Sequence, residues 1–161
     1  MYKKRGTKMR TKKMRLVSVF LALAMMLLLV PVGAFAEEAN LMDGRCGENV
    51  KWVLTQNNTD TSKPTYTLTI TGTGAMADKR YYDQPWNWAR KLITKIEINE
   101  GVTAIGAYNF FECSRLADVK IPDSVTSIGE SAFKYCDNLT SVTLPNRVTS
   151  IGESTFEDCY G

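Results

Sequence analysis

The sequence of 161 residues contains no histidine. This absence excludes Ser-His-Asp and Cys-His catalysis, His-ligated zinc and the commonest general base near neutral pH. Acidic residues are missing from the first 36 positions, where eight of the 20 Lys and Arg residues lie. The rest of the chain has 12 basic and 17 acidic residues, a net charge of −5. An acidic body without a basic patch predicts that nucleic acid is not a partner.

The first 36 residues have the pattern of a secretory signal peptide. Basic residues are concentrated in 1–15, and the apolar tract Leu16–Val30 follows directly. Small residues at Ala34 and Ala36 occupy the two positions that a signal peptidase requires before its cut. The pattern predicts an N-terminal signal helix, cleavage after Ala36, and a secreted or cell-surface protein.

A permanent membrane anchor is the alternative interpretation of the same segment. The apolar tract extended to Ala36 has 21 residues, which is long enough to span a bilayer. Pro31 and Gly33 interrupt a helix there, and this favours cleavage. Contact with a membrane is expected only through this segment, and only if it stays uncleaved.

The body of the chain repeats itself every 23 residues, which is the signature of a solenoid. Ten positions recur at this spacing: Val102/Val125/Val148, Thr103/Thr126/Thr149, Ile105/Ile128/Ile151, Gly106/Gly129/Gly152, Phe110/Phe133/Phe156, Cys113/Cys136/Cys159, Leu116/Leu139, Val119/Val142, Ile121/Leu144 and Pro122/Pro145. Residues 93–161 therefore form two complete coils with a partial first and a partial last coil.

Each unit combines two local patterns. L-x-x-V-x-I-P alternates like a short strand that proline ends, and V-T-x-I-G-x-x-A-F-x-x-C has the apolar spacing of a short helical turn. The prediction is an α/β repeat solenoid of leucine-rich repeat coils, each with a short parallel strand and a short helical turn. Because one coil cannot bury its apolar edge, the recurring phenylalanines should line up in one column through the stack.

The repeat IPDSVTSIGESAFKYCDNLTSVTLP (Ile121–Pro145) resembles that of the BspA-like leucine-rich repeat family. Arg45–Trp88 is similar to the leader module that often precedes such repeats. The resemblance implies a surface or secreted protein that binds proteins, extracellular matrix or a host surface, with adhesion as its setting. Members usually carry many coils and a closing segment, whereas this sequence shows no C-terminal cap after its last coil.

Residues 37–44 are expected to be a linker and 45–92 a β-rich capping module. Two alternating runs, 50–55 and 65–71, predict a β-hairpin. Two tryptophans precede the first coil and are expected to cover its apolar face. Stacking of a sugar or peptide on these rings is the functional alternative.

The cysteines at one position of three successive coils predict a buried ladder, because a small apolar side chain suits that position. Cys46 stands apart, and a disulfide between Cys46 and Cys113 remains an alternative. Without a C-x-x-C pair, stacked thiols do not indicate a metal site. No metal and no cofactor are predicted.

No residue is predicted to be catalytic, so the sequence does not indicate an enzyme. The one alternative of this kind is an exported hydrolase that uses carboxylates around Asp78–Asp83. This loop also carries Tyr81 and Tyr82, a mixture that can bind sugars or Ca²⁺, but it lacks the spaced acidic residues of an EF-hand. A solvated loop is the favoured interpretation.

The outward positions of the repeat strands form the candidate binding surface. Aligned coils place Lys95 beside Asp118 and Glu97 beside Lys120, as opposite-charge pairs that fix the register of neighbouring strands. The same face is the one by which repeat proteins commonly bind partners. The candidate residues on this strand face are Thr94, Lys95, Glu97, Asp118, Lys120, Ser141 and Thr143.

Taken together, the sequence predicts a secreted or cell-surface interaction and adhesion module without chemistry of its own. The alternative is a structural spacer, or a fragment of a larger exported surface protein.

Overall fold

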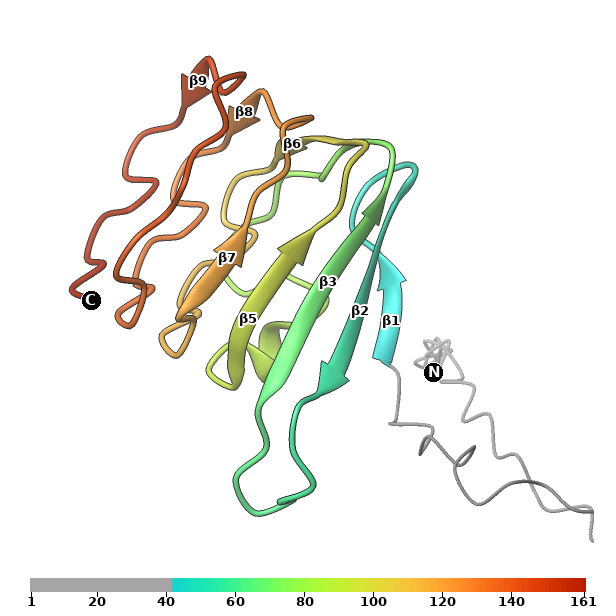
Figure 1. The fold of residues 1–161 in the computed structure, drawn as a ribbon, viewed down its shortest axis with the longest axis vertical. Coiled ribbons are helices and arrows are strands. Elements are labelled where there is room, and N and C mark those ends of the chain that lie inside the picture. The colour runs from blue at the N-terminus through green and yellow to red at the C-terminus, as the bar shows by residue number, and fades with distance from the viewer. Residues whose placement is uncertain (1–41) are drawn as a thin grey trace, which may run out of the picture. The chain divides into compact units, whose positions relative to one another are not determined.

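The structure, a computed structural model, describes residues 42–161. Over this part of the chain the windings contribute short strands to two sheets, as Figure 1 shows, and the last winding contributes only to the second. The first sheet has the order β1-β2-β3-β5-β7 and the second the order β4-β6-β8-β9. The strands are β1 (Met42–Arg45), β2 (Val50–Gln56), β3 (Tyr66–Gly72), β4 (Gly74–Ala75), β5 (Ile93–Ile98), β6 (Val102–Ile105), β7 (Asp118–Lys120), β8 (Ser127–Ile128) and β9 (Ser150–Ile151).

The predicted hairpin is formed by β2 and β3, which pair antiparallel with Trp52 opposite Ile70. The sequence did not indicate β1, which pairs antiparallel with the other edge of β2. On its far side β3 pairs parallel with β5, and Leu68 lies opposite Ile96. The hairpin therefore supplies the first strand of the repeat sheet, so the module expected to cap the repeats shares one sheet with them.

The prediction of a helical turn in each coil is wrong. The V-T-x-I segment forms a short strand of the second sheet, in β6 and β8, and the residues after it form turns. In residues 42–161 the only helical element is a short 3-10 helix, η1 (Asn87–Ala89), which lies before β5. The repeat coils are therefore all-β windings closed by turns.

Left-handed backbone at two residues of the turn segment explains the absence of a helix. In the coil that contains β8, Ser131 and Tyr135 have φ values of 50° and 61°. A right-handed helix cannot continue through such residues. The turns are instead closed by hydrogen bonds between residues three apart, for example from the N–H of Lys134 to the carbonyl of Ser131 at 3.3 Å.

The remaining amide donors of the turn segment are used between coils. The N–H groups of Ser131, Phe133 and Tyr135 donate to carbonyl oxygens of the next coil over 2.9–3.0 Å. The preceding coil repeats the pattern: the N–H of Phe110 donates to the carbonyl of Ala132 at 2.9 Å. These bonds between coils satisfy backbone groups that a helix would have satisfied within itself.

Aromatic rings run through the coils in a single column, as the period predicted. The centroid separations are 5.7 Å from Trp52 to Trp86, 6.0 Å from Trp86 to Phe110, 5.1 Å from Phe110 to Phe133 and 5.4 Å from Phe133 to Phe156. All of these rings except that of Phe156 are buried. The column joins the hairpin, through Trp52, to the repeats in one hydrophobic core.

The cysteine ladder is present. Cys113 and Cys136 are buried and Cys159 is half-buried, and all four cysteines of the chain are free thiols. The bridge between Cys46 and Cys113 is therefore absent. The Cys136 thiol donates to the carbonyl oxygen of Phe110 at 3.3 Å, and Cys159 makes the equivalent bond one coil later at 3.2 Å. The thiols thus act as weak donors that link each coil to the one before it.

The recurring glycine of the unit lies where two coils approach most closely. A Cβ atom at Gly129 would lie 2.5 Å from the backbone nitrogen of Ala107 in the preceding coil. Gly152 meets Glu130 in the same way one coil later. No side chain fits at this position, which explains why glycine recurs there every 23 residues.

The segment predicted to be a signal peptide lies outside the described residues, as does most of the expected linker. Within residues 42–161, no helix is both long enough and apolar enough to cross a membrane.

Candidate interaction surface on the first sheet

The structure brings most of the predicted strand-face residues onto adjacent strands. Lys95 and Glu97 lie on β5, and their partners in register on β7 are Asp118 and Lys120. This arrangement is the one that the 23-residue spacing indicated. Inward-facing Ile96 lies between the two β5 residues and is fully buried.

Thr94 lies apart from this row because the β3–β5 ladder is irregular at that point. Tyr66 pairs with Ile93 and Thr67 with Lys95, so that Thr94 has no counterpart on β3. Its hydroxyl oxygen accepts a hydrogen bond of 3.2 Å from the side-chain amide of Asn57, in the loop after β2. Thr94 therefore anchors the hairpin loop to the sheet.

Ion pairs on this surface centre on Lys95. Its ammonium lies 2.8 Å from a carboxylate oxygen of Glu97 and 3.8 Å from one of Asp118. The hydrogen bond and the charge of Glu97 raise the pKa of Lys95, and the same contact lowers the pKa of Glu97. The expected pair between Lys95 and Asp118 is thus present, whereas Glu97 turns to Lys95 on its own strand.

Lys120 keeps its charge available as a result. No carboxylate in residues 42–161 lies within ion-pair distance of its ammonium, although Glu97 is its neighbour in register. Lys120 is exposed. An unpaired, exposed ammonium can form an ion pair with a partner without first breaking a pair within the protein.

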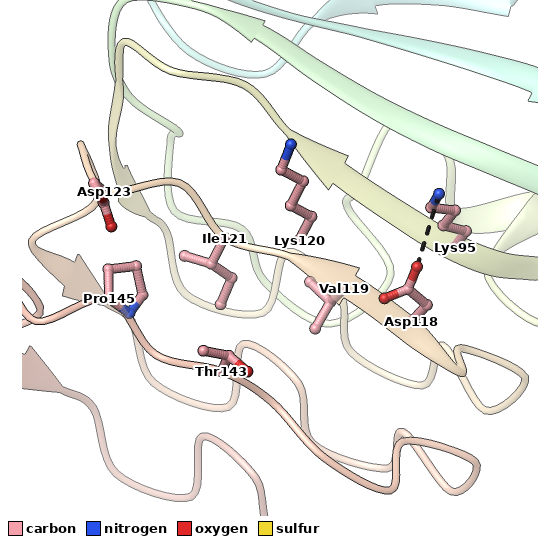
Figure 2. A pocket seen from close by; sticks show the side chains of 8 residues that line it. All are labelled: Lys95, Asp118, Val119, Lys120, Ile121, Asp123, Thr143 and Pro145. Atoms are coloured by element: carbon pink, nitrogen blue, oxygen red, sulfur yellow. Dashed lines mark ion pairs between the residues drawn. The ribbon is translucent and has the colours of Figure 1, made fainter.

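A groove of about 410 Å³ runs between β7 and the next coil. In the part of the chain that the structure describes, the first sheet ends at β7, and residues 141–145 follow beside it without strand pairing. Figure 2 shows side chains of β7, among them Asp118 and Lys120, on one side of the groove, and the uncharged Thr143 and Pro145 of the next coil on the other. The lining residues are Lys95, Asp118, Val119, Lys120, Ile121, Asp123, Thr143 and Pro145.

The groove combines charged and apolar side chains. Lys120 and the Lys95–Asp118 ion pair provide charge, while Val119 and Pro145 offer partly buried apolar surface. Its volume falls within the range of about 300–1,000 Å³ that is usual for ligand sites. Of the other two predicted residues, Thr143 lines the groove and Ser141 is exposed on the same coil segment.

Asp78, one carboxylate of the alternative hydrolase site, is engaged by the backbone of the following coil. Asp78 accepts a hydrogen bond of 2.8 Å from the backbone N–H of Ala107, and so it tethers its loop to the next coil. Across residues 42–161, no three Cys, Asp or Glu side chains are grouped so that they could hold a metal ion.

The two tryptophans of the capping module have separate places. Trp86 is buried in the aromatic column, and its indole N–H donates to the carbonyl of Asn109 at 3.1 Å. The side chain of Trp88 is 51% exposed and meets Tyr66 edge-on at 5.7 Å. Trp86 therefore covers the first coil as expected, while Trp88 remains at the surface.

The sequence analysis noted Tyr81 and Tyr82 but missed the cluster of aromatic side chains on the turn segments to which they belong. The tyrosine patch consists of Tyr81, Tyr82, Tyr108, Phe111 and Tyr135, whose rings contact one another. The signal that could have found it is a departure from the repeat. In the next coil Ser131 replaces Tyr108 and Lys134 replaces Phe111.

Comparison with known proteins identifies the repeats. Residues 87–161 match the family described as BspA type leucine rich repeat region, in six copies. The resemblance seen in the sequence is thereby confirmed over these residues. No curated protein sequence matches the chain.

Solved structures of bacterial leucine-rich repeat proteins are similar to this one. A leucine-rich repeat protein from Eubacterium ventriosum is 34% identical, with a TM-score of 0.64, over 73% of this chain and 29% of that protein. One from Bacteroides ovatus is 27% identical, with a TM-score of 0.44, over 65% of this chain and 31% of that protein. The leucine-rich repeat protein of T. pallidum is 19% identical, with a TM-score of 0.44, over 66% and 64%. The chain thus spans less than a third of the length of the E. ventriosum protein.

Proposed function

Since residues 87–161 are a leucine-rich repeat region of the BspA type, we propose that the chain is an exported, non-catalytic binding protein that holds a protein partner against its first sheet. Leucine-rich repeats generally bind proteins through such surfaces. The observation that carries the proposal is the groove between β7 and the next coil, with the unpaired ammonium of Lys120 at its wall.

The groove favours a partner segment with an acidic and an apolar side chain. A carboxylate would pair with Lys120, and an apolar group would cover Val119 and Pro145. Rim charges of this kind set the register and the association rate of a complex, whereas buried apolar contacts supply most of its affinity. Lys95 is shared between Glu97 at 2.8 Å and Asp118 at 3.8 Å, so Lys120 is the positive charge of this surface that is left for a partner.

Export is part of the proposal. It rests on the basic, apolar and Ala-x-Ala pattern of residues 1–36, which predicts cleavage before Glu37. The extracellular matrix or the surface of a host cell would then be the setting in which the groove meets its partner. Expression of the full chain in a secreting bacterium and N-terminal sequencing of the exported product test this part, and a product that begins at Met1 would contradict it.

The binding surface is tested by charge exchange. The exported protein and a variant with Lys95→Glu, Glu97→Lys, Asp118→Lys and Lys120→Glu are passed over immobilised collagen, fibronectin and laminin, and association is measured by surface plasmon resonance. The net charge stays the same, and we expect affinity to fall by about tenfold or more.

The matched control exchanges Lys134 and Glu157, an ion pair on the turn segments at 2.7 Å. It should keep the affinity of the unaltered protein. Equal losses in both variants would contradict a site on the first sheet, and absence of binding by the unaltered protein would favour the spacer alternative.

A further inference from the structure

The tyrosine patch is a second exposed surface, separate from the strands of the first sheet. Tyr81 and Tyr82 are 53% and 50% exposed, and Tyr135 is 37% exposed. Their rings gather around Phe111, which is almost fully buried. The ring centroid of Tyr81, from the segment before this coil, lies 4.8 Å from that of Phe111, and the centroid of Tyr135, from the coil after it, lies 5.4 Å away. The patch therefore extends across the turn segments of adjacent coils.

The coil fold does not require these aromatic residues. Ser131 and Lys134 occupy the positions of Tyr108 and Phe111 one coil later, and the backbone keeps its course. Exposed rings that the scaffold does not need indicate a use on the surface.

Cations and carboxylates hold the rings in place. The guanidinium of Arg90 lies 4.9 Å from the ring centre of Tyr82, and the ammonium of Lys134 lies 5.1 Å from that of Tyr135. Glu112 accepts hydrogen bonds from the Tyr82 hydroxyl at 3.1 Å and from Arg90 at 3.2 Å. Each of these contacts limits rotation of an exposed side chain, and a preorganised surface loses less entropy when a ligand binds.

A polar hollow of about 270 Å³ opens beside the patch. It is lined by Lys91, Glu112, Ser114, Tyr135 and Asp137. These side chains offer hydrogen-bond donors and acceptors around one aromatic ring. The lining holds one lysine and two carboxylates, and Arg90, which pairs with Glu112 at 3.2 Å from outside the lining, balances the remaining negative charge.

We propose that the tyrosine patch and its hollow bind a neutral pyranose unit of a glycan. A pyranose has an apolar C–H face that packs on an aromatic ring, and hydroxyl groups that both donate and accept hydrogen bonds. The hollow offers partners for both. A charge-balanced hollow gives no preference for a sulfated or sialylated sugar, and its carboxylates are not needed by a proline-rich peptide, the other common ligand of tyrosine surfaces.

Affinity electrophoresis tests the proposal. The exported protein is run in native gels that contain mannan, galactomannan, xyloglucan or mixed-linkage β-glucan, and at least one of these is expected to retard it. Tyr81→Ala and Tyr135→Ala should each weaken the retardation by about fivefold to tenfold. Tyr135→Phe keeps the ring and should retain most of it.

Tyr160→Ala is the matched control, because Tyr160 is a tyrosine that is 77% exposed and lies outside the patch. It should migrate like the unaltered protein, as should Lys120→Glu on the first sheet. Circular dichroism melts identify variants that fail to fold, and Tyr81→Ala, the more exposed site, then decides the result.

Three outcomes would overturn the proposal. They are no retardation by any neutral polysaccharide, retardation that both tyrosine variants retain, and binding only to heparin or to a proline-rich peptide. The Lys120→Glu control separates this result from the proposed function, because loss of protein binding at the first sheet leaves glycan binding at the patch intact.

Discussion

The indoles of Trp52 and Trp86 meet edge to face, with 5.7 Å between ring centroids and an angle of 69° between ring planes. Trp52 comes from the hairpin, and Trp86 begins the column that the phenylalanines of the repeats continue. This contact makes the hairpin the first layer of the repeat core.

Trp52→Ala should therefore destabilise the whole solenoid. The side chain is only 6% exposed, and truncation of a buried aromatic costs about 3–5 kcal/mol. Urea denaturation followed by circular dichroism gives the free energy of unfolding. Trp88→Ala, which removes a half-exposed indole, should change it by less than about 0.5 kcal/mol. If the two variants lose the same stability, Trp52 does not close the column.

Within the column, the stability lost when a ring is truncated should depend on how deeply that ring is buried. Phe133 is fully buried between Phe110 and Phe156, and Phe133→Ala should cost about 3–5 kcal/mol. Phe156 is only partly buried, so Phe156→Ala should cost clearly less. The same denaturation experiment measures both. A melting temperature unaffected by Phe133→Ala would place its ring outside the core.

Cys159 should be the most reactive thiol of the folded protein. The neighbouring Cys136 thiol lowers the pKa of Cys159 to about 7, whereas burial raises that of Cys46 to about 11 and that of Cys113 to about 12. Near neutral pH about half of the Cys159 side chains are thiolates, the form that reacts. Alkylation by iodoacetamide followed by peptide mass mapping should label Cys159 first.

The cause of this reactivity can be tested in the same experiment. Cys136→Ala removes the neighbouring thiol, so the pH at which Cys159 reaches half of its maximal rate should rise. Labelling of Cys46 before Cys159, or a pH profile of Cys159 labelling that Cys136→Ala does not change, would contradict the effect of Cys136 on the pKa of Cys159.

Acid should weaken the fold through two carboxyl groups that face lysines. Hydrogen bonds from Lys95 and Lys134 lower the pKa of Glu97 and Glu157, respectively. A carboxyl group whose folded pKa lies below its unfolded value of about 4.3 stabilises the fold above that value. This contribution is lost as pH falls through the folded pKa. The free energy of unfolding should therefore decrease as the pH falls below about 4.3, the unfolded value, and on through the lower folded pKa.

Substitution of both lysines by methionine should flatten this pH dependence, and high salt should reduce it because the groups are exposed. Stability that rises on acidification would show that these contacts do not operate in solution.

The periodic features were predictable because each coil faces the same packing problem. Phe133 and Cys136 recur every 23 residues since equivalent positions lie over one another, and the column and the ladder follow from that. The register of Lys95 with Asp118 follows from the same arithmetic.

The helical turn was a wrong prediction because apolar spacing does not separate a helix from a chain of turns. Both bring residues three or four apart to one side, and the left-handed residues Ser131 and Tyr135 are not glycines that would have marked a break. The hydrogen bonds to the next coil, which decide between the two forms, involve the backbone alone and leave no trace in side-chain type.

The sequence did not show that β3 belongs to the first winding, because the separation between β3 and β5 is not 23 residues. Ile70 pairs with Ile98, which lies 28 residues later, so an insertion hides β3 from a search at 23. The tyrosine patch escaped for the opposite reason: its members break the pattern, and a search for repetition discards them.

The amide groups that cross between coils also constrain how such a chain can change in length. Adding or deleting one residue in a turn would mismatch the donors of that winding with the acceptors of its neighbours, and near Gly129 it would place a side chain where none fits. Growth or shrinkage by whole units leaves all of these matches in place. Proteins built on this plan should therefore differ in length by multiples of one winding, with local insertions confined to segments, such as that before β5, where the amides serve their own coil.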